Sequence, residues 1–371
     1  MKISKKLRSN LITYAIVIIA YLVCQLAISG EIDGFKMGRL IKGQLVPICV
    51  YIVMAVSLNL TVGISGELSL GHAGFMSVGA FSGIIMSSWL VSAFGGSESV
   101  LSFLADDKTV RLILALVAGG VMAGIAGVLI GIPVLRLRGD YLAIVTLAFG
   151  EIIRNVLNTL YFSVEGAALH IGFNNPAIAG KMIYNGPAGA VGVAKIATFD
   201  MGFVLILFTL FVVLNLVNSR SGRAIMAIRD SRIAAESVGL NVTKYKMMAF
   251  VTSAVLAGMA GALYGLNYST VTAAKFKFDT SILVLVFVVL GGIGSIRGSV
   301  IAAAALTLLP ELLRSFSNYR MLVYAVVLIL VMLATNSSIL KNLWAKITLI
   351  PAVEKLLKKF PNSERQVTQH E

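Results

Sequence analysis

The two ionisable side chains in the most unusual setting, Glu67 and His72, lie inside apolar sequence. Both fall in SLNLTVGISGELSLGHAGFMSVGA, residues 57–80, together with five glycines and four serines. A carboxylate and an imidazole in a membrane segment could line a solute path. They could equally be structural, because a carboxylate suits the first turn of a helix and small neighbours let helices approach closely. We expect Glu67 to open a new helix near the cytoplasmic side and His72 to hydrogen-bond between helices, with the path as the alternative for both.

Sequence patterns that would indicate catalysis are absent. No G-x-x-x-x-G-K-[ST] nucleotide loop occurs, and no Cys/His cluster has the spacing of a zinc site. The three histidines lie far apart in the sequence, without a GxSxG or HExxH motif. We therefore predict that the chain is not an enzyme, with no catalytic residue, no metal site and no bound cofactor.

The composition places the chain in a membrane. Hydrophobic residues make up 58% and charged residues only 13%, with a mean hydropathy of +0.90. A soluble domain carries about a quarter charged residues. The apolar runs, such as LITYAIVIIAYLVCQLAI, are continuous and lack the period-two alternation of a membrane β-barrel. The sequence predicts an all-α fold, a polytopic integral membrane helical bundle.

The apolar runs predict about ten transmembrane helices. They cover residues 11–28, 45–63, 69–94, 111–134, 140–160, 201–217, 247–268, 280–294, 298–313 and 320–336. The second and third runs join through glycine-rich sequence without a charged loop, and so do the eighth and ninth, so broken or re-entrant helices are expected at both junctions. The transmembrane domain is thus predicted over residues 1–340, followed by a basic cytoplasmic tail, 341–371.

Charge predicts the sidedness of these spans. With the N-terminus inside, cytoplasmic segments hold 19 of the 31 basic residues and external segments hold 11, which favours two cytoplasmic termini. The net charge of +14 then indicates topology and contact with membrane lipid instead of nucleic acid. Residues 163–200 are predicted to be an external loop. Residues 218–245 are predicted to hold one or two short cytoplasmic helices, with Ser221 as an N-cap and Gly239 as the stop.

Polar or small residues at the glycine-rich breaks indicate a transporter or channel. Glu151 and Arg154 share one face of the fifth span, and we expect this pair to face protein or a pore. The candidates for a translocation path are Asn59, Gly63, Gly66, Glu67, Ser69, His72, Thr146 and Glu151.

Five stretches resemble one family. They are residues 57–81, VLRLRGDYLAIVTLAFGEIIRNVL (134–157), NGPAGAVGV (185–193), SGRAIMAIRDSRIAAESVGLNVTKYKMMAFVTSAVLAGMAGALYG (221–265) and VVLGGIGSIRGSVIAAA (288–304). Together they resemble permease subunits of branched-chain amino acid ABC importers, in particular the M-type of the two paired permeases. The resemblance implies translocation of leucine, isoleucine and valine across the cytoplasmic membrane of a prokaryote.

The resemblance also implies partners. Such permeases pair with a second permease as a heterodimer, receive substrate from an external binding protein, and are driven by two cytoplasmic ATPase subunits that use ATP. The family's ATPase-coupling motif corresponds here to Ala234 and Ala235 with Gly239, while Ile233 stands where other importers have Glu. Basic residues on this loop can meet an acidic ATPase surface. They are Arg223, Arg229 and Arg232.

Two alternatives remain open at the level of sequence. The same architecture could carry urea, an amide or another small solute, because related permeases share these glycine-rich motifs. An ion-coupled secondary transporter would need an acidic ion site within the spans, for which Glu67 and Glu151 are the candidates.

Overall fold

The computed structural model describes residues 5–29, 39–94, 103–137, 139–166, 168–173, 180–313 and 320–336. The chain divides into two compact units, Met1–Glu311 and Leu312–Glu371. In the second unit, α13 spans Arg320–Asn336. The predicted basic tail, 341–371, lies outside the described residues.

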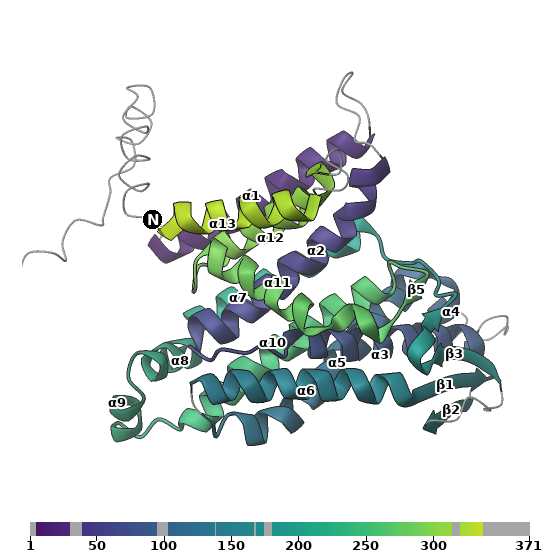
Figure 1. Ribbon diagram of the computed structural model, residues 1–371, viewed down its shortest axis with the longest axis horizontal. Helices are drawn as coiled ribbons and strands as arrows, with labels where there is room; N and C mark the ends of the chain where they lie inside the picture. Colours follow the sequence, from purple (N-terminus) through teal and green to yellow (C-terminus); the bar gives the residue numbers. More distant parts are fainter. Residues whose placement is uncertain are drawn as a thin grey trace, which may run out of the picture. The chain divides into compact units, whose positions relative to one another are not determined.

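The first unit is mainly helical (Figure 1). Its helices are α1 Lys5–Ser29, α2 Arg39–Asn59, a π-helix Leu60–Ile64, α3 His72–Phe94, α4 Phe103–Asp106, α5 Lys108–Val134, α6 Asp140–Thr159, α7 Phe199–Asn218, α8 Arg220–Asp230, α9 Arg232–Ser237, α10 Val242–Gly265, α11 Phe278–Gly291 and α12 Ile296–Leu312.

Each of the ten predicted spans coincides with a helix. Within the described residues, six helices are long and apolar enough to cross a membrane. They are α2 with its π-helical extension, α3, α5, α6, α7 and α10. A multi-pass membrane protein is therefore confirmed, and the count of about ten spans stays a prediction.

The core of the first unit forms where α3, α5 and α10 cross at glycines. A Cβ placed on Gly79 of α3 would stand 2.0 Å from the carbonyl oxygen of Gly258 in α10. A Cβ on Gly258 would stand 2.5 Å from the carbonyl oxygen of Gly119 in α5. Backbones this close require glycine, and small residues at helix crossings commonly let membrane helices pack closely. The glycine-rich sequence of these helices thus fixes which faces meet.

The prediction of an all-α fold is wrong at one end of the unit. An antiparallel sheet of five strands lies there, in the order β2-β1-β3-β4-β5. Its strands are β1 Leu160–Glu165, β2 Ala168–Phe173, β3 Lys181–Asn185, β4 Gly189–Val191 and β5 Thr270–Val271. Much of the predicted external loop is therefore sheet, and it pairs with a short strand that follows α10.

Packing against helices explains why this sheet forms from sequence rich in turn residues. Tyr184 of β3 is fully buried, its ring centroid lies 4.7 Å from that of Phe81 in α3, and its hydroxyl donates to the Leu157 carbonyl at 2.8 Å. Burial also raises the pKa of the Tyr184 phenol. Gly189 at the start of β4 has a φ of +75°, which favours glycine. A Cβ at this position would stand 2.2 Å from the Val271 carbonyl oxygen, so only glycine allows β4 to lie this close to β5.

Residues 219–241, which hold α8 and α9, connect α7 to α10 and are called the α8–α9 loop from here on. The sheet and the α8–α9 loop lie at opposite ends of the first unit (Figure 1). The sheet residues from 163 on were predicted to be external, and alternation from a cytoplasmic N-terminus puts the connection after the seventh predicted span, which holds β5, on the same side. The α8–α9 loop and the connection between α2 and α3 were predicted to be cytoplasmic, and they contact each other at the other end. The predicted alternation of sides fits this arrangement, and which end faces the cytoplasm stays a prediction.

Candidate functional site

The connection between α2 and α3 is a break in helical structure, and residues 60–71 are called the break from here on. The π-helix ends at Ile64, and Gly66 with a φ of +75° turns the chain away from the helix axis. Residues 66–71 are not helical, and α3 begins at His72. The prediction that Glu67 stands in the first turn of the new helix is therefore wrong. A side chain from α11 caps α3 instead, since Ser281 Oγ accepts from the Ala73 amide at 3.0 Å.

Asn59 joins the end of α2 to the turn between α11 and α12. Its Oδ1 accepts from the Gly294 amide at 2.8 Å, and its Nδ2 donates to Ser299 Oγ at 3.0 Å. Gly63 allows a close approach of the two segments, because a Cβ at this position would stand only 2.3 Å from the Gly294 nitrogen. The two glycine-rich junctions of the sequence therefore meet in space and are held together by one buried amide.

His72 is hydrogen-bonded between helices, as predicted. Its Nε2 lies 2.8 Å from Ser57 Oγ in α2, and the histidine is only 2% exposed. The Ser57 hydroxyl also donates to the Met54 carbonyl at 2.9 Å, so the geometry suits a neutral imidazole whose Nε2–H donates to Ser57. The Ser57 carbonyl in turn accepts from Ser253 of α10 at 2.6 Å. These bonds tie the start of α3 to α2 and α10.

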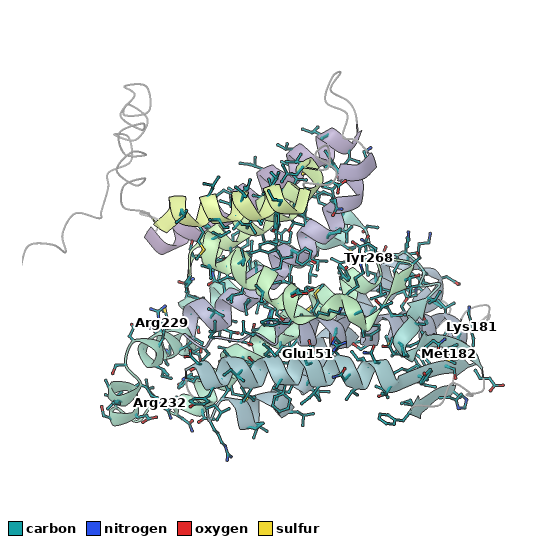
Figure 2. All side chains as sticks on the ribbon, viewed as in Figure 1. Glu151, Lys181, Met182, Arg229, Arg232 and Tyr268 are labelled. Carbon is teal, nitrogen blue, oxygen red and sulfur yellow. The ribbon has the colours of Figure 1, made fainter. Side chains whose placement is uncertain are left out.

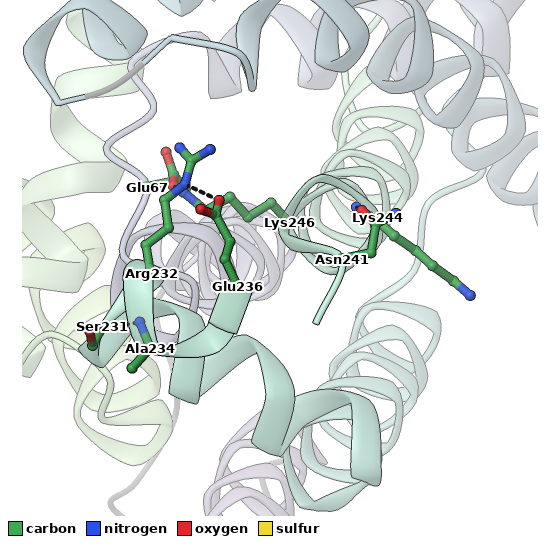
Figure 3. A network of polar contacts seen from close by, with 8 residues as sticks. All are labelled: Glu67, Ser231, Arg232, Ala234, Glu236, Asn241, Lys244 and Lys246. Atoms are coloured by element: carbon green, nitrogen blue, oxygen red, sulfur yellow. Dashed lines mark hydrogen bonds and ion pairs between the residues drawn. The ribbon is translucent and has the colours of Figure 1, made fainter. Parts of the chain in front are cut away.

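Glu67 forms an ion pair with Lys246, in the first turns of α10 (Figure 3). The side chains are 9% and 12% exposed, so each charge is largely withdrawn from water and depends on the other. Sequence reasoning did not find Lys246, because nothing local links two residues 179 positions apart. The carboxylate of Glu67 thus fastens the break to α10.

Of the two path candidates on α6, only Thr146 is hydrogen-bonded to the break. Thr146 Oγ1 accepts from the Leu70 amide at 3.0 Å, and a Cβ on Gly71 would stand 2.2 Å from the Thr146 carbonyl oxygen. Glu151 instead pairs with Arg154 at 2.7 Å, and the two side chains are 33% and 23% exposed. The predicted i, i+3 pair is therefore confirmed, on a half-buried face of α6.

Two hydroxyls of the break have no hydrogen-bond partner within the described part of the chain. They belong to Ser65 and Ser69, which are 3% and 2% exposed. A buried hydroxyl without a partner costs free energy, on the order of 1–3 kcal/mol. The described conformation of the break therefore leaves two buried hydroxyls unsatisfied.

Local capping shapes the short helices of the α8–α9 loop. Ser219, not the predicted Ser221, caps α8 by accepting from the Gly222 amide at 3.1 Å. Ser231 caps α9 in the same way.

The predicted stop of α9 at Gly239 is confirmed. Gly239 has a φ of +80°, and its amide donates to the Glu236 carbonyl at 3.0 Å. The next amide, of Leu240, reaches back to Ala235 at 3.0 Å, which completes a Schellman motif.

The tip of the loop exposes apolar side chains. Ile233 is 82% exposed and Val238 is 75% exposed, whereas Ala235 is only 4% exposed and packs with Ile228 and Val242. Arg232 pairs with Glu236 along α9 at 2.7 Å (Figure 3). The loop therefore presents two exposed apolar side chains close to Arg232.

Arg229 connects α8 to the break. Its Nη1 donates to the Gly63 carbonyl at 2.9 Å, and its side-chain stem lies over Gly66, where a Cβ would come within 2.6 Å of Cγ. The guanidinium also pairs with Asp230 at 3.0 Å. Figure 2 shows Arg229 and Arg232 at the loop end of the unit and Lys181 at the sheet end. Arg229 therefore links the α8–α9 loop directly to the break.

The structure thus gathers seven of the eight predicted path residues around the break, all except Glu151. It places Arg229, predicted for the loop surface, in contact with the break, while Arg223 donates to the Asn218 carbonyl at 3.4 Å. Several partners escaped the sequence prediction, among them Lys246, Ser299 and Gly294. No group of three or more His, Cys, Asp or Glu side chains that could hold a metal ion occurs among the residues described.

Comparisons with known proteins agree on one family. Residues 40–332 match the family model described as branched-chain amino acid transport system / permease component. The high-affinity branched-chain amino acid transport system permease protein LivM of Escherichia coli (strain K12) is 33% identical over 318 residues, covering 76% of this chain and 66% of that protein. The probable branched-chain amino acid transport permease protein LivM of Methanocaldococcus jannaschii is 24% identical over 279 residues, covering 71% of this chain and 78% of that protein.

A shorter match concerns a second type of permease. The high-affinity branched-chain amino acid transport system permease protein LivH of Escherichia coli (strain K12) is 32% identical over 124 residues, 33% of this chain and 40% of that protein. The match to the Escherichia coli LivM protein spans 66% of its length, slightly less than two thirds. No solved structure matches this chain.

Proposed function

Because this chain belongs to the family of branched-chain amino acid transport permease components, we propose that it is the membrane-spanning permease subunit of an ABC importer. The proposed activity is translocation of leucine, isoleucine and valine across the cytoplasmic membrane of a prokaryote. The family match over residues 40–332 is the observation that carries the proposal. The family is one of transport components and not of enzymes, and ATP is proposed to be used by separate subunits.

We propose four partner chains for this permease. The likeness to LivH supports a second permease, because LivM and LivH are two separately named permease proteins of the high-affinity branched-chain amino acid transport system in Escherichia coli. Two cytoplasmic ATPases and an external substrate-binding protein complete the proposed machine. The α8–α9 loop, with Ile233 and Val238 exposed, supplies the surface on which an ATPase is proposed to dock.

The contacts of Arg229 suggest how an ATPase could act on the membrane helices. A movement of α9 reaches α8 through the Ile228, Ala235 and Val242 cluster, and reaches the break through Arg229 and Gly63. The break contacts α6 and α10, and its Gly63 contacts Gly294 in the α11–α12 turn. We propose that docking at α9 shifts the break, and that its polar residues, with Ser65 and Ser69 free to bind, line the path while it is open.

Reconstitution tests the proposed function. This chain, the second permease and both ATPases are incorporated into liposomes, with the binding protein outside and ATP inside. We expect uptake of labelled leucine that unlabelled isoleucine and valine inhibit, and that urea or acetamide does not. Uptake driven by an ion gradient without ATPases would contradict the proposal, as would uptake that only urea or acetamide inhibits.

Crosslinking tests the docking surface. Ile233→Cys is expected to crosslink to an ATPase subunit with a short bifunctional thiol–amine reagent, because the side chain is 82% exposed at the tip of the loop. Ala235 is a poor position for this purpose because it is buried. Cys24 is replaced by serine beforehand, and Cys49 is buried and unreactive. The control is Val191→Cys, 62% exposed on β4 at the sheet end. An equal yield from both positions, or none from Ile233→Cys in assembled complex, would refute docking at α9.

A further inference from the structure

A cavity of about 260 Å³ lies at the sheet end of the first unit, far from the break. It is open on one side and is lined by the last turns of α3, the first turn of α5 and the strands β1, β3 and β4. Its wall combines serine hydroxyls, including those of Ser88 and Ser92, with aliphatic side chains such as Val164 and Val191. Two cations complete it, Arg111 and Lys181, and no acidic residue is among the described residues that line it.

Arg111 is the unusual member of this cavity. The residue is only 8% exposed, and one guanidinium nitrogen, Nη1, donates to the Ala105 carbonyl at 3.2 Å. The Nε atom is buried and has no hydrogen-bond partner within the described part of the chain. Arg111 also stands in the first turn of α5, where the helix dipole disfavours a cation. Burial deprives this guanidinium of part of its hydration, and an anion beside its accessible donors would offset that loss.

The remaining wall indicates what kind of anion fits. Lys181 on β3 supplies a second, exposed cation at the edge of the cavity (Figure 2). A guanidinium recognises planar carboxylates through parallel N–H donors. Aliphatic side chains line the same cavity as these cations and suit a short hydrocarbon body.

We propose that this cavity binds a small carboxylic acid with an aliphatic body, its carboxylate against Arg111 and its hydrocarbon against Val164 and Val191. Because the transported solutes proposed above are aliphatic amino acids, the site would receive the substrate at the sheet end of the permease. This last step rests on the proposed function. The carboxylate site itself rests only on the cavity and on Arg111.

Calorimetric titration of the assembled complex, in nanodiscs of zwitterionic lipid without ATP, tests the proposal. We expect 4-methylpentanoate and L-leucine to bind and 3-methylbutylamine, which lacks the carboxylate, not to bind. Arg111→Gln should weaken binding of 4-methylpentanoate at least tenfold, and Arg111→Lys should restore part of it. Lys277→Gln removes an exposed cation that does not line the cavity and should leave binding unchanged.

Several outcomes would overturn the inference. Affinity unchanged in Arg111→Gln would do so, and so would equal binding of the amine. If Arg111→Gln does not assemble, Lys181→Gln serves instead, and unchanged affinity in that variant also counts against the site. Stabilisation by phosphatidylglycerol nanodiscs with no binding of 4-methylpentanoate would assign the cavity to a lipid headgroup. Leucine uptake in liposomes without this binding would refute the inference alone, whereas binding without any uptake would refute the proposed function alone.

Discussion

Gly79→Ala is expected to prevent the helical core from assembling, and to reduce the yield of monodisperse protein severely. The added methyl would stand 2.0 Å from the Gly258 carbonyl oxygen and 2.4 Å from its Cα, both backbone atoms of α10. No rotamer change relieves such a contact, so α3 and α10 would have to move apart along their shared face. Overpacking of a core costs typically 1–3 kcal/mol, and we expect at least the upper part of that range here.

Gly43→Ala is the matched control for this prediction. It makes the same chemical change within α2, where a Cβ would meet nothing within 4 Å. Alanine favours a helix over glycine by roughly 1 kcal/mol, so this variant should be as stable as the parent or more stable. Size-exclusion profiles and thermal unfolding in detergent measure both. Equal unfolding temperatures for the two variants would show that the close approach of α3 and α10 does not matter for stability.

Arg229→Ala is expected to lower uptake in the reconstituted complex about tenfold while the ATPases stay bound. The change removes the bond to the Gly63 carbonyl and the stem packed over Gly66, so a movement of α8 no longer reaches the break directly. A hydrogen bond from a charged donor is worth about 1.5–3 kcal/mol. Because Arg229 is 39% exposed, we take the lower end, which corresponds to roughly one factor of ten.

Two further variants separate coupling from charge. Arg229→Lys keeps the cation but offers a single donating group in place of the planar fork, and should recover uptake only in part. Arg220→Ala removes an exposed arginine from the start of α8 and should behave as the parent. Uptake and ATP hydrolysis are measured in the same liposomes. Hydrolysis that persists while uptake falls is the expected sign of broken coupling, and parental uptake in Arg229→Ala would exclude this residue from it.

Features that depend on the local chain could be predicted from the sequence. The apolar runs located ten helices, and the turn chemistry around Gly239 located the end of α9. The small neighbours of His72 led to the prediction that it hydrogen-bonds between helices, which the contact with Ser57 confirms. These predictions succeed because hydrophobic length, backbone freedom and side-chain size are properties of a few consecutive residues, and each acts wherever the segment lies in the fold.

Features that depend on distant residues were decided by the tertiary structure. The sheet required β1 to β4 to meet β5, which follows α10, and to bury Tyr184 against α3, so no local pattern of short strands could reveal it. The position of Glu67 was wrongly predicted because Gly66 delays the start of α3 and because the partner of the carboxylate, Lys246, lies on α10.

The sequence by itself therefore determined that this protein is a helical membrane permease with two glycine-rich breaks. Only the tertiary structure decided that Asn59 holds the two glycine-rich junctions together, and that Arg229 joins the break to the α8–α9 loop. The physical reason is that hydrophobic burial acts on whole segments and can be read along the chain. A hydrogen bond or ion pair exists only between two particular atoms, and the folded backbone alone brings those atoms within 3 Å.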